Sequence, residues 1–170
     1  MKRKRAFEKI IIGIMLLTMV FSCCGCVKKA TAVGLVSVAL GISTEGGIIE
    51  EKVDTHGGFH NDGMTFIKIS FEDKAFAKQA AVSEHWNALP MTGNLATILW
   101  GDGYTSFFAN EKGEPYVPEV KEGLYYFYDR HKESTDKYSY EDIMDRYSFN
   151  FDAAVYDAEN NVLYFVQLDT

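Results

Sequence analysis

Two alternating segments near the C-terminus predict a β-hairpin, and they constrain the fold more than any other feature of the chain. Residues 149–156 read F-N-F-D-A-A-V-Y, the turn sequence D-A-E-N-N follows, and residues 162–168 return as V-L-Y-F-V-Q-L. Apolar side chains at every second position indicate a strand with one buried face, because successive side chains point to opposite sides of a sheet. A chain with this ending is expected to contain an antiparallel sheet.

The remaining patterns predict an α+β fold with a mainly antiparallel sheet built from hairpins. Strands and helices do not alternate regularly along the chain, which argues against a doubly wound parallel sheet. Two short helices are expected after the first hairpin and one short helix before the C-terminal hairpin. The expected strands are 48–54 and 65–71, which form the first hairpin, then 104–109, 115–118 and 124–129, and the expected helices are 73–84, 92–100 and 139–147.

Residues 1–26 predict a signal peptide with its attachment region. Five basic side chains lie within the first nine residues, and an apolar run of about 12 residues follows at 10–21. A membrane-spanning helix needs about 20 apolar residues, so a cleaved signal is favoured over a single-span anchor.

The three cysteines, Cys23, Cys24 and Cys26, directly follow this apolar run, and none occurs after them, so the folded domain contains no disulfide. The sequence V-F-S-C at 20–23 resembles the lipobox of bacterial lipoproteins. That resemblance implies acylation of Cys23, with Cys24 and Cys26 as alternatives. We therefore expect attachment to the lipid bilayer of the cell membrane through an acylated N-terminal cysteine, facing outside the cytoplasm.

The rest of the chain is expected to form a tether at 27–47 and a single domain at 48–170. The tether contains an unusually apolar run, Ala30–Ile42, which could pack on the domain, lie near the membrane or extend the signal. Residues 1–22 carry a net charge of +4 and the whole chain −7, which leaves −11 for the remainder. So acidic a surface disfavours nucleic acid as a partner, and we expect a monomer.

One polar stretch, V-D-T-H-G-G-F-H-N-D-G at 53–63, contains candidate metal ligands. Imidazole and carboxylate groups bind zinc and other divalent ions, so His56, His60 and Asp62 form a candidate site, with Asp54 as a further ligand. His131 could supply a third imidazole if strand 124–129 neighbours the first hairpin. The competing interpretation is a glycine-rich turn whose histidines lie in solvent or against an aromatic ring.

No sequence motif nominates a catalytic residue. Cysteine nucleophiles are excluded after residue 26, and no G-x-S-x-G, H-E-x-x-H, phosphate-loop, dinucleotide-binding or EF-hand pattern occurs. No cofactor is therefore expected, apart from a divalent metal at the polar stretch.

The mature region resembles small bacterial lipoproteins of unknown function. The segments D-T-H-G-G-F-H-N-D-G, Y-Y-F-Y-D-R-H and the C-terminal hairpin carry this resemblance, which implies no activity. We interpret the chain as a lipid-anchored extracytoplasmic binding or envelope-interaction module. The alternative is a metal-binding protein or metal-dependent hydrolase using the His56, His60 and Asp62 loop.

Overall fold

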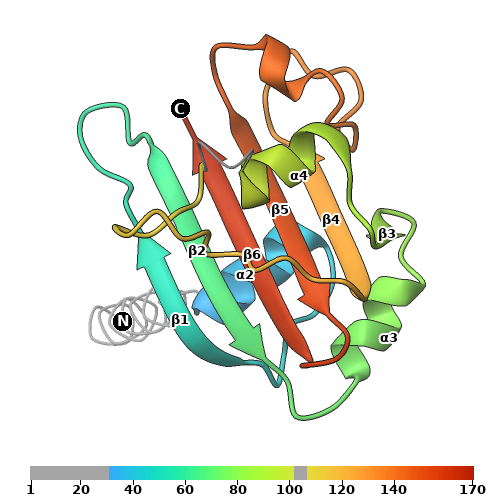
Figure 1. Cartoon of the computed structure of the whole chain (residues 1–170). Coiled ribbons are helices and arrows are strands. Elements are labelled where there is room, and N and C mark those ends of the chain that lie inside the picture. The colour runs from blue at the N-terminus through green and yellow to red at the C-terminus, as the bar shows by residue number, and fades with distance from the viewer. Residues whose placement is uncertain (1–30, 102–106) are drawn as a thin grey trace, which may run out of the picture. The chain divides into compact units, whose positions relative to one another are not determined.

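Over the residues that it describes, the structure shows one antiparallel six-stranded sheet with helices on both faces, which confirms the predicted α+β class (Figure 1). The computed structural model describes residues 31–101 and 107–170. The strand order is β1-β2-β6-β5-β4-β3. The strands are β1 (Ile48–Asp54), β2 (Gly63–Ser70), β3 (Trp86–Ala88), β4 (Gly123–Asp129), β5 (Asn150–Asp157) and β6 (Val162–Asp169), and the helices are α2 (Ala32–Leu40), α3 (Ala75–Ala81), α4 (Gly93–Trp100) and the 3₁₀ turn η1 (Ile143–Asp145).

The two predicted hairpins meet in the middle of the sheet. The last strand, β6, pairs with β5 on one side and with β2 on the other, so the final hairpin joins the first. The prediction of strands at 104–109 and 115–118 was wrong for the described residues 107–118, which contribute only a bridge between Ala109 and Pro115. Proline cannot donate to a strand ladder, which limits pairing there.

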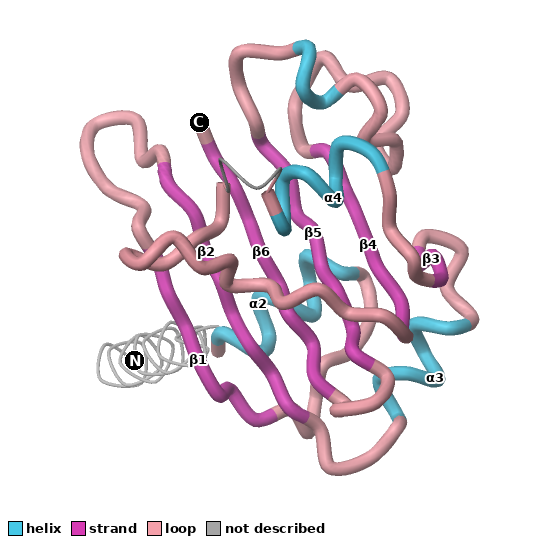
Figure 2. Tube along the Cα trace, in the orientation of Figure 1, coloured by secondary structure: helices cyan, strands magenta, loops and turns pink. Residues whose placement is uncertain are grey.

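Each face of the sheet has its own hydrophobic core. Helix α4 and the segment 107–120 cover one face, and helices α2 and α3 cover the other (Figures 1 and 2). The alternating strands supply both cores, because every second side chain points to the opposite face. The first core includes Leu95, Phe108, Phe127, Phe151 and Val166, and the second includes Val36, Ile69, Phe76, Tyr156 and Phe165.

Helix α2 lies within the segment expected as a tether, and it packs on the sheet. Its residues Val36 and Leu40 are buried in the second core. The N-cap Thr31 accepts a hydrogen bond from the amide of Gly34, and the helix ends at Gly41 with φ of 65°. The compact unit therefore begins at Thr31 rather than at residue 48.

The segment after α2 is fastened back onto the helix. The side chain of Thr44, which is fully buried, donates to the carbonyl of Val33 at 2.8 Å, and its amide donates to Ser37 Oγ at 2.9 Å. These bonds satisfy polar groups that burial would otherwise leave unpaired. The predicted signal peptide and the three cysteines lie outside the described residues. In the part that the structure describes, no helix is long and apolar enough to cross a membrane.

Residues 31–170 contain all the described strands and helices and both cores, as a domain that folds on its own requires. Strand β1 lies at one edge of the sheet and is nearly all exposed. Its pairing with β2 is interrupted by a register shift between Ile49 and Glu51.

Candidate functional site

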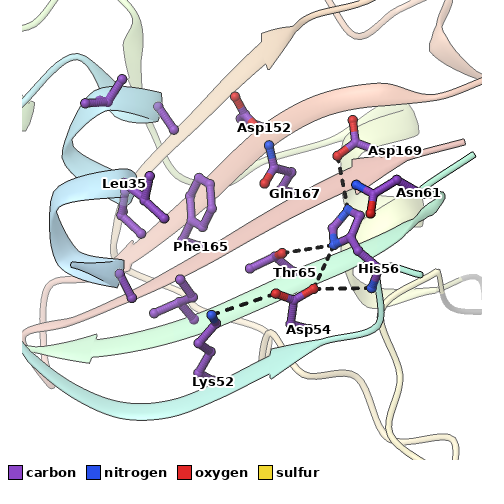
Figure 3. Close-up of a pocket in the computed structure, with 15 residues that line it drawn as sticks. Leu35, Lys52, Asp54, His56, Asn61, Thr65, Asp152, Phe165, Gln167 and Asp169 are labelled. Carbon is purple, nitrogen blue, oxygen red and sulfur yellow. Dashed lines mark hydrogen bonds and ion pairs between the residues drawn. The ribbon is translucent and has the colours of Figure 1, made fainter. Parts of the chain in front are cut away.

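A groove of about 570 Å³ lies between helix α2 and the part of the sheet that α2 leaves uncovered (Figure 3). Leu35, Val38 and Ala39 of the helix form its apolar wall. Charged and polar side chains from β1, β2, β5, β6 and the β1–β2 loop form the rest, namely Lys52, Asp54, His56, Asn61, Thr65, Asp152, Gln167 and Asp169.

The register of the strands explains why the floor of the groove changes from apolar to polar. Ile67, Phe165 and Ala154 lie opposite one another on β2, β6 and β5 and form an apolar row that contributes to the second core. Side chains return to the same face two residues away on each strand, here toward the end of the sheet that carries the β1–β2 loop. The resulting row is polar and runs Asp54, Thr65, Gln167, Asp152 and Tyr128 across β1, β2, β6, β5 and β4.

His56 closes the polar end of the groove, and Gly63 makes its position possible. A Cβ atom on Gly63 would lie 2.5 Å from the Cα of His56 and 2.6 Å from its backbone nitrogen. Real Cβ contacts are never so short, so only glycine at 63 allows the two backbones to approach this closely. The glycine-rich character of the loop thus has one specific structural role.

Both ring nitrogens of His56 contact carboxylates. Nδ1 lies 2.8 Å from Asp54 Oδ1 and Nε2 lies 3.1 Å from Asp169 Oδ2 (Figure 3). The His56 side chain is only 14% exposed, so these contacts hold the ring between β1 and the end of β6.

The network continues from Asp169 to a buried carboxylate. Arg130 Nη1 lies 2.8 Å from Asp169 Oδ1, and its Nε lies 3.0 Å from Asp152 Oδ1. Arg130 also donates to the carbonyls of Phe151 and Leu168, which fixes its guanidinium against the ends of β5 and β6. One continuous chain of contacts therefore joins Asp54, His56, Asp169, Arg130 and Asp152.

The two ends of this network differ in proton affinity. The hydrogen bond from His56 lowers the pKa of Asp54, which lies at the exposed edge. Burial raises the pKa of Asp152 to about 6, because Arg130 offsets only part of the desolvation. Asp152 is only 4% exposed, so its ionised form is less favourable than that of Asp54.

The same contacts argue against His56 as the general base of a nucleophilic pair. The hydroxyl of Thr65 lies 3.4 Å from His56 Nδ1, but Asp54 lies closer to that nitrogen, at 2.8 Å. A base must be free to accept the proton of its nucleophile. The geometry instead suits the binding of a ligand with an apolar part and a polar head.

Of the five predicted metal ligands, His56 and Asp54 are in contact, but the set does not form a metal site. His60 is exposed, with its ring edge against Phe59 at a centroid distance of 5.1 Å. Asp62 is exposed in the same loop, where its backbone carbonyl accepts a hydrogen bond from the amide of Gly57. Within residues 31–101 and 107–170, no three His, Cys, Asp or Glu side chains are arranged to hold a metal ion.

His131 follows β4, which is separated from the first hairpin by two strands, β6 and β5. At about 4.8 Å per strand, this separates β4 from β2 by about 14 Å. The Nδ1 atom of His131 accepts the amide of Glu133 in its own loop. The Asp129 carboxylate accepts a hydrogen bond from the backbone amide of His131 and pairs with Arg146.

Sequence reasoning found His56 and Asp54 but missed Asp152, Asp169 and Arg130. A signal was present, since Gln167 and Asp169 continue the face of β6 that begins with buried Leu163 and Phe165. Polar side chains on the buried face of a strand mark the place where the core ends. Comparison of the chain with protein-family models, curated proteins and solved structures finds no significant match.

Proposed function

We propose that the protein is a lipid-anchored extracytoplasmic binding module whose groove beside α2 takes a small ligand with an apolar part and a polar head. The observation that carries this proposal is the two-sided lining of the groove, with Leu35 and Val38 opposite the Asp54, His56 and Asp169 cluster. Ligand sites are concave, largely apolar and fitted with a few fixed polar groups. A volume of about 570 Å³ is within the usual range for such sites.

Exposed apolar side chains on α2 support a binding role for this wall. Leu35 is 56% exposed and Val38 is 82% exposed, although other residues of the same helix are buried. Covering apolar surface with a ligand is favourable by about 25 cal/mol for each Å² removed from water. The helix thus offers contact area that folding itself does not use.

The polar end supports binding because its side chains are already held in place. His56, Asp169 and Arg130 each make at least two polar contacts, so a ligand would meet oriented groups. Preorganisation of this kind lowers the entropy cost of association.

The groove is tested with the domain lacking residues 1–27 and with 1-hexanol as a neutral amphiphilic probe, observed by chemical-shift changes in ¹⁵N NMR spectra. Val38→Ser should weaken binding about fivefold, because it removes apolar contact from the wall. Val82→Ser is the matched control, since Val82 is 85% exposed and does not line the groove. Equal affinities for both variants would refute the groove as the binding site.

The anchor is tested separately in cells. The proposal rests on the basic and apolar leader and on Cys23 at the end of the V-F-S-C sequence. Cys23→Ala should abolish labelling by a palmitate analogue and release the protein from the membrane fraction, because acyl chains supply the attachment. Ala30→Ser is a control outside the cysteine cluster, and undiminished labelling of Cys23→Ala would move the modification to Cys24 or Cys26.

A further inference from the structure

We propose that the ligand of the groove is a protonated primary amine carried on an apolar chain. This inference rests on the proposed binding function and adds the chemical class of the head group. It is argued from the charge balance of the groove, from the accessible hydrogen-bond acceptors and from the arrangement of its apolar and polar ends.

The groove has no excess positive charge with which an anion could pair. Three carboxylates line it, those of Asp54, Asp152 and Asp169, against one lysine, Lys52. Arg130 lies behind the lining and pairs with Asp152 and Asp169. With these groups ionised the five side chains sum to −1, and a proton on His56 would bring the sum to zero, so in neither case does the groove carry excess positive charge.

The field around the groove has the same sign. Residues 31–170 contain 10 basic and 23 acidic side chains, a net charge of −13. A strongly acidic surface raises the local concentration of cations and speeds their association. An anionic amphiphile would be repelled by this negative field. Its head group would also compete with Asp54 and Asp169 for the donors that they already contact.

Two carboxylates at the head of the groove offer accessible hydrogen-bond acceptors. The side chains of Asp54 and Asp169 are 45% and 26% exposed, so both carboxylates can be reached from the groove. A primary ammonium has three donors and no acceptor, and its hydrogen bonds to carboxylates are charge-assisted. Lys52 already places an ammonium 3.8 Å from Asp54 Oδ2, which shows that this carboxylate can be approached by such a group.

The apolar and polar parts are spaced for a short chain. The apolar row through Ile67 and Phe165 lies two residues from the polar row through Thr65 and Gln167. At about 3.4 Å per residue, the two rows are about 7 Å apart along the strands. An alkyl chain lying against Leu35 and Phe165 would therefore bring its terminal ammonium to Asp54 and Asp169 (Figure 3).

The test compares three probes with the same six-carbon chain, hexylammonium, hexanoate and 1-hexanol, on the domain lacking residues 1–27. Affinities are measured by ¹⁵N NMR titration at neutral pH and low salt. We expect hexylammonium to bind about tenfold more tightly than 1-hexanol, the scale of one charge-assisted hydrogen bond, and hexanoate to bind most weakly.

Two variants locate the ammonium. Asp54→Asn and Asp169→Asn should each weaken hexylammonium binding about three- to tenfold and leave 1-hexanol binding unchanged. Glu119→Gln, at an exposed position outside the groove, is the control for the loss of one negative charge. One-dimensional NMR spectra establish that each variant is folded, and the second aspartate variant serves if the first is not.

The outcomes separate the two proposals. Equal or tighter binding of hexanoate or 1-hexanol would overturn the amine as ligand, and so would hexylammonium binding that neither aspartate variant weakens. In those cases a loss of affinity in Val38→Ser would still support the groove as a binding site. If no probe shifts resonances of groove residues, both the ligand class and the proposed function fail.

Discussion

Replacing Asp152 with asparagine tests the electrostatic reasoning at its most buried point. The substitution keeps the size of the side chain and removes its titrating group. Arg130 retains its contact with Asp169 at 2.8 Å, so the guanidinium is not left without a carboxylate. The variant therefore isolates the cost of ionising a carboxylate that is only 4% exposed.

The direction of the effect follows from the raised pKa of Asp152. Burial raises this pKa from 3.8 to about 6, so the folded protein holds the proton more tightly than the unfolded chain does. The stability that protonated Asp152 contributes is complete below about pH 4 and is lost as the pH rises through about 6. Each pKa unit corresponds to about 1.4 kcal/mol, which gives a change of about 3 kcal/mol.

The assay is urea denaturation of the domain lacking residues 1–27, followed by circular dichroism from about pH 4 to about pH 7.5. The free energy of unfolding of the wild type minus that of Asp152→Asn should fall by about 3 kcal/mol across this range. Subtraction removes the pH dependence of all groups that the two proteins share. Glu119→Gln, at an exposed position, is the control for the loss of one negative charge.

Two results would refute this reasoning. A difference that stays constant to within about 0.5 kcal/mol would mean that Asp152 titrates normally in the folded protein. A difference that grows with pH would mean that attraction to Arg130 outweighs burial and lowers the pKa.

Two further predictions concern the β1–β2 loop. Gly63→Ala should move His56 and lower the free energy of unfolding by about 1–3 kcal/mol, because the new Cβ would overlap the His56 backbone. Gly57→Ala is the control, since a Cβ there meets nothing within 4 Å. Equal unfolding midpoints for the two variants would contradict the prediction. In metal analysis of the purified domain we expect less than one zinc per chain, because His56 contacts carboxylates through both nitrogens; one bound zinc that is lost in a His56→Ala, His60→Ala double variant would instead establish the metal site.

Strands β2, β5 and β6 were predictable because alternating apolar side chains mark them in the sequence. Strand β1 spans Ile48–Asp54, as the pattern indicated, and β5 and β6 form the expected closing hairpin. Helix α2 was missed because its apolar run lacks a polar face and contains Gly34 within the helix. Its packing against the sheet, through Val36 and Leu40, stabilises the helix in the folded protein.

The groove was only half predictable because its residues come from distant parts of the chain. The pattern around His56 drew attention to Asp54, which is two residues away and contacts the same ring. Asp169 lies 113 positions from His56, and only the pairing of β6 with β2 brings them together. The same strand order places two strands between β2 and β4, and it is this insertion that separates His131 from the first hairpin.

The irregular edge strand β1 has a consequence for crowding. A lipid anchor would confine many copies to one plane, where a regular free edge invites a neighbouring chain to add its own strand. The register shift after Ile49 breaks that template, and the consecutive charges of Glu50, Glu51 and Lys52 would have to be desolvated in any continuous ladder. We therefore expect the domain to resist lateral aggregation even when packed densely.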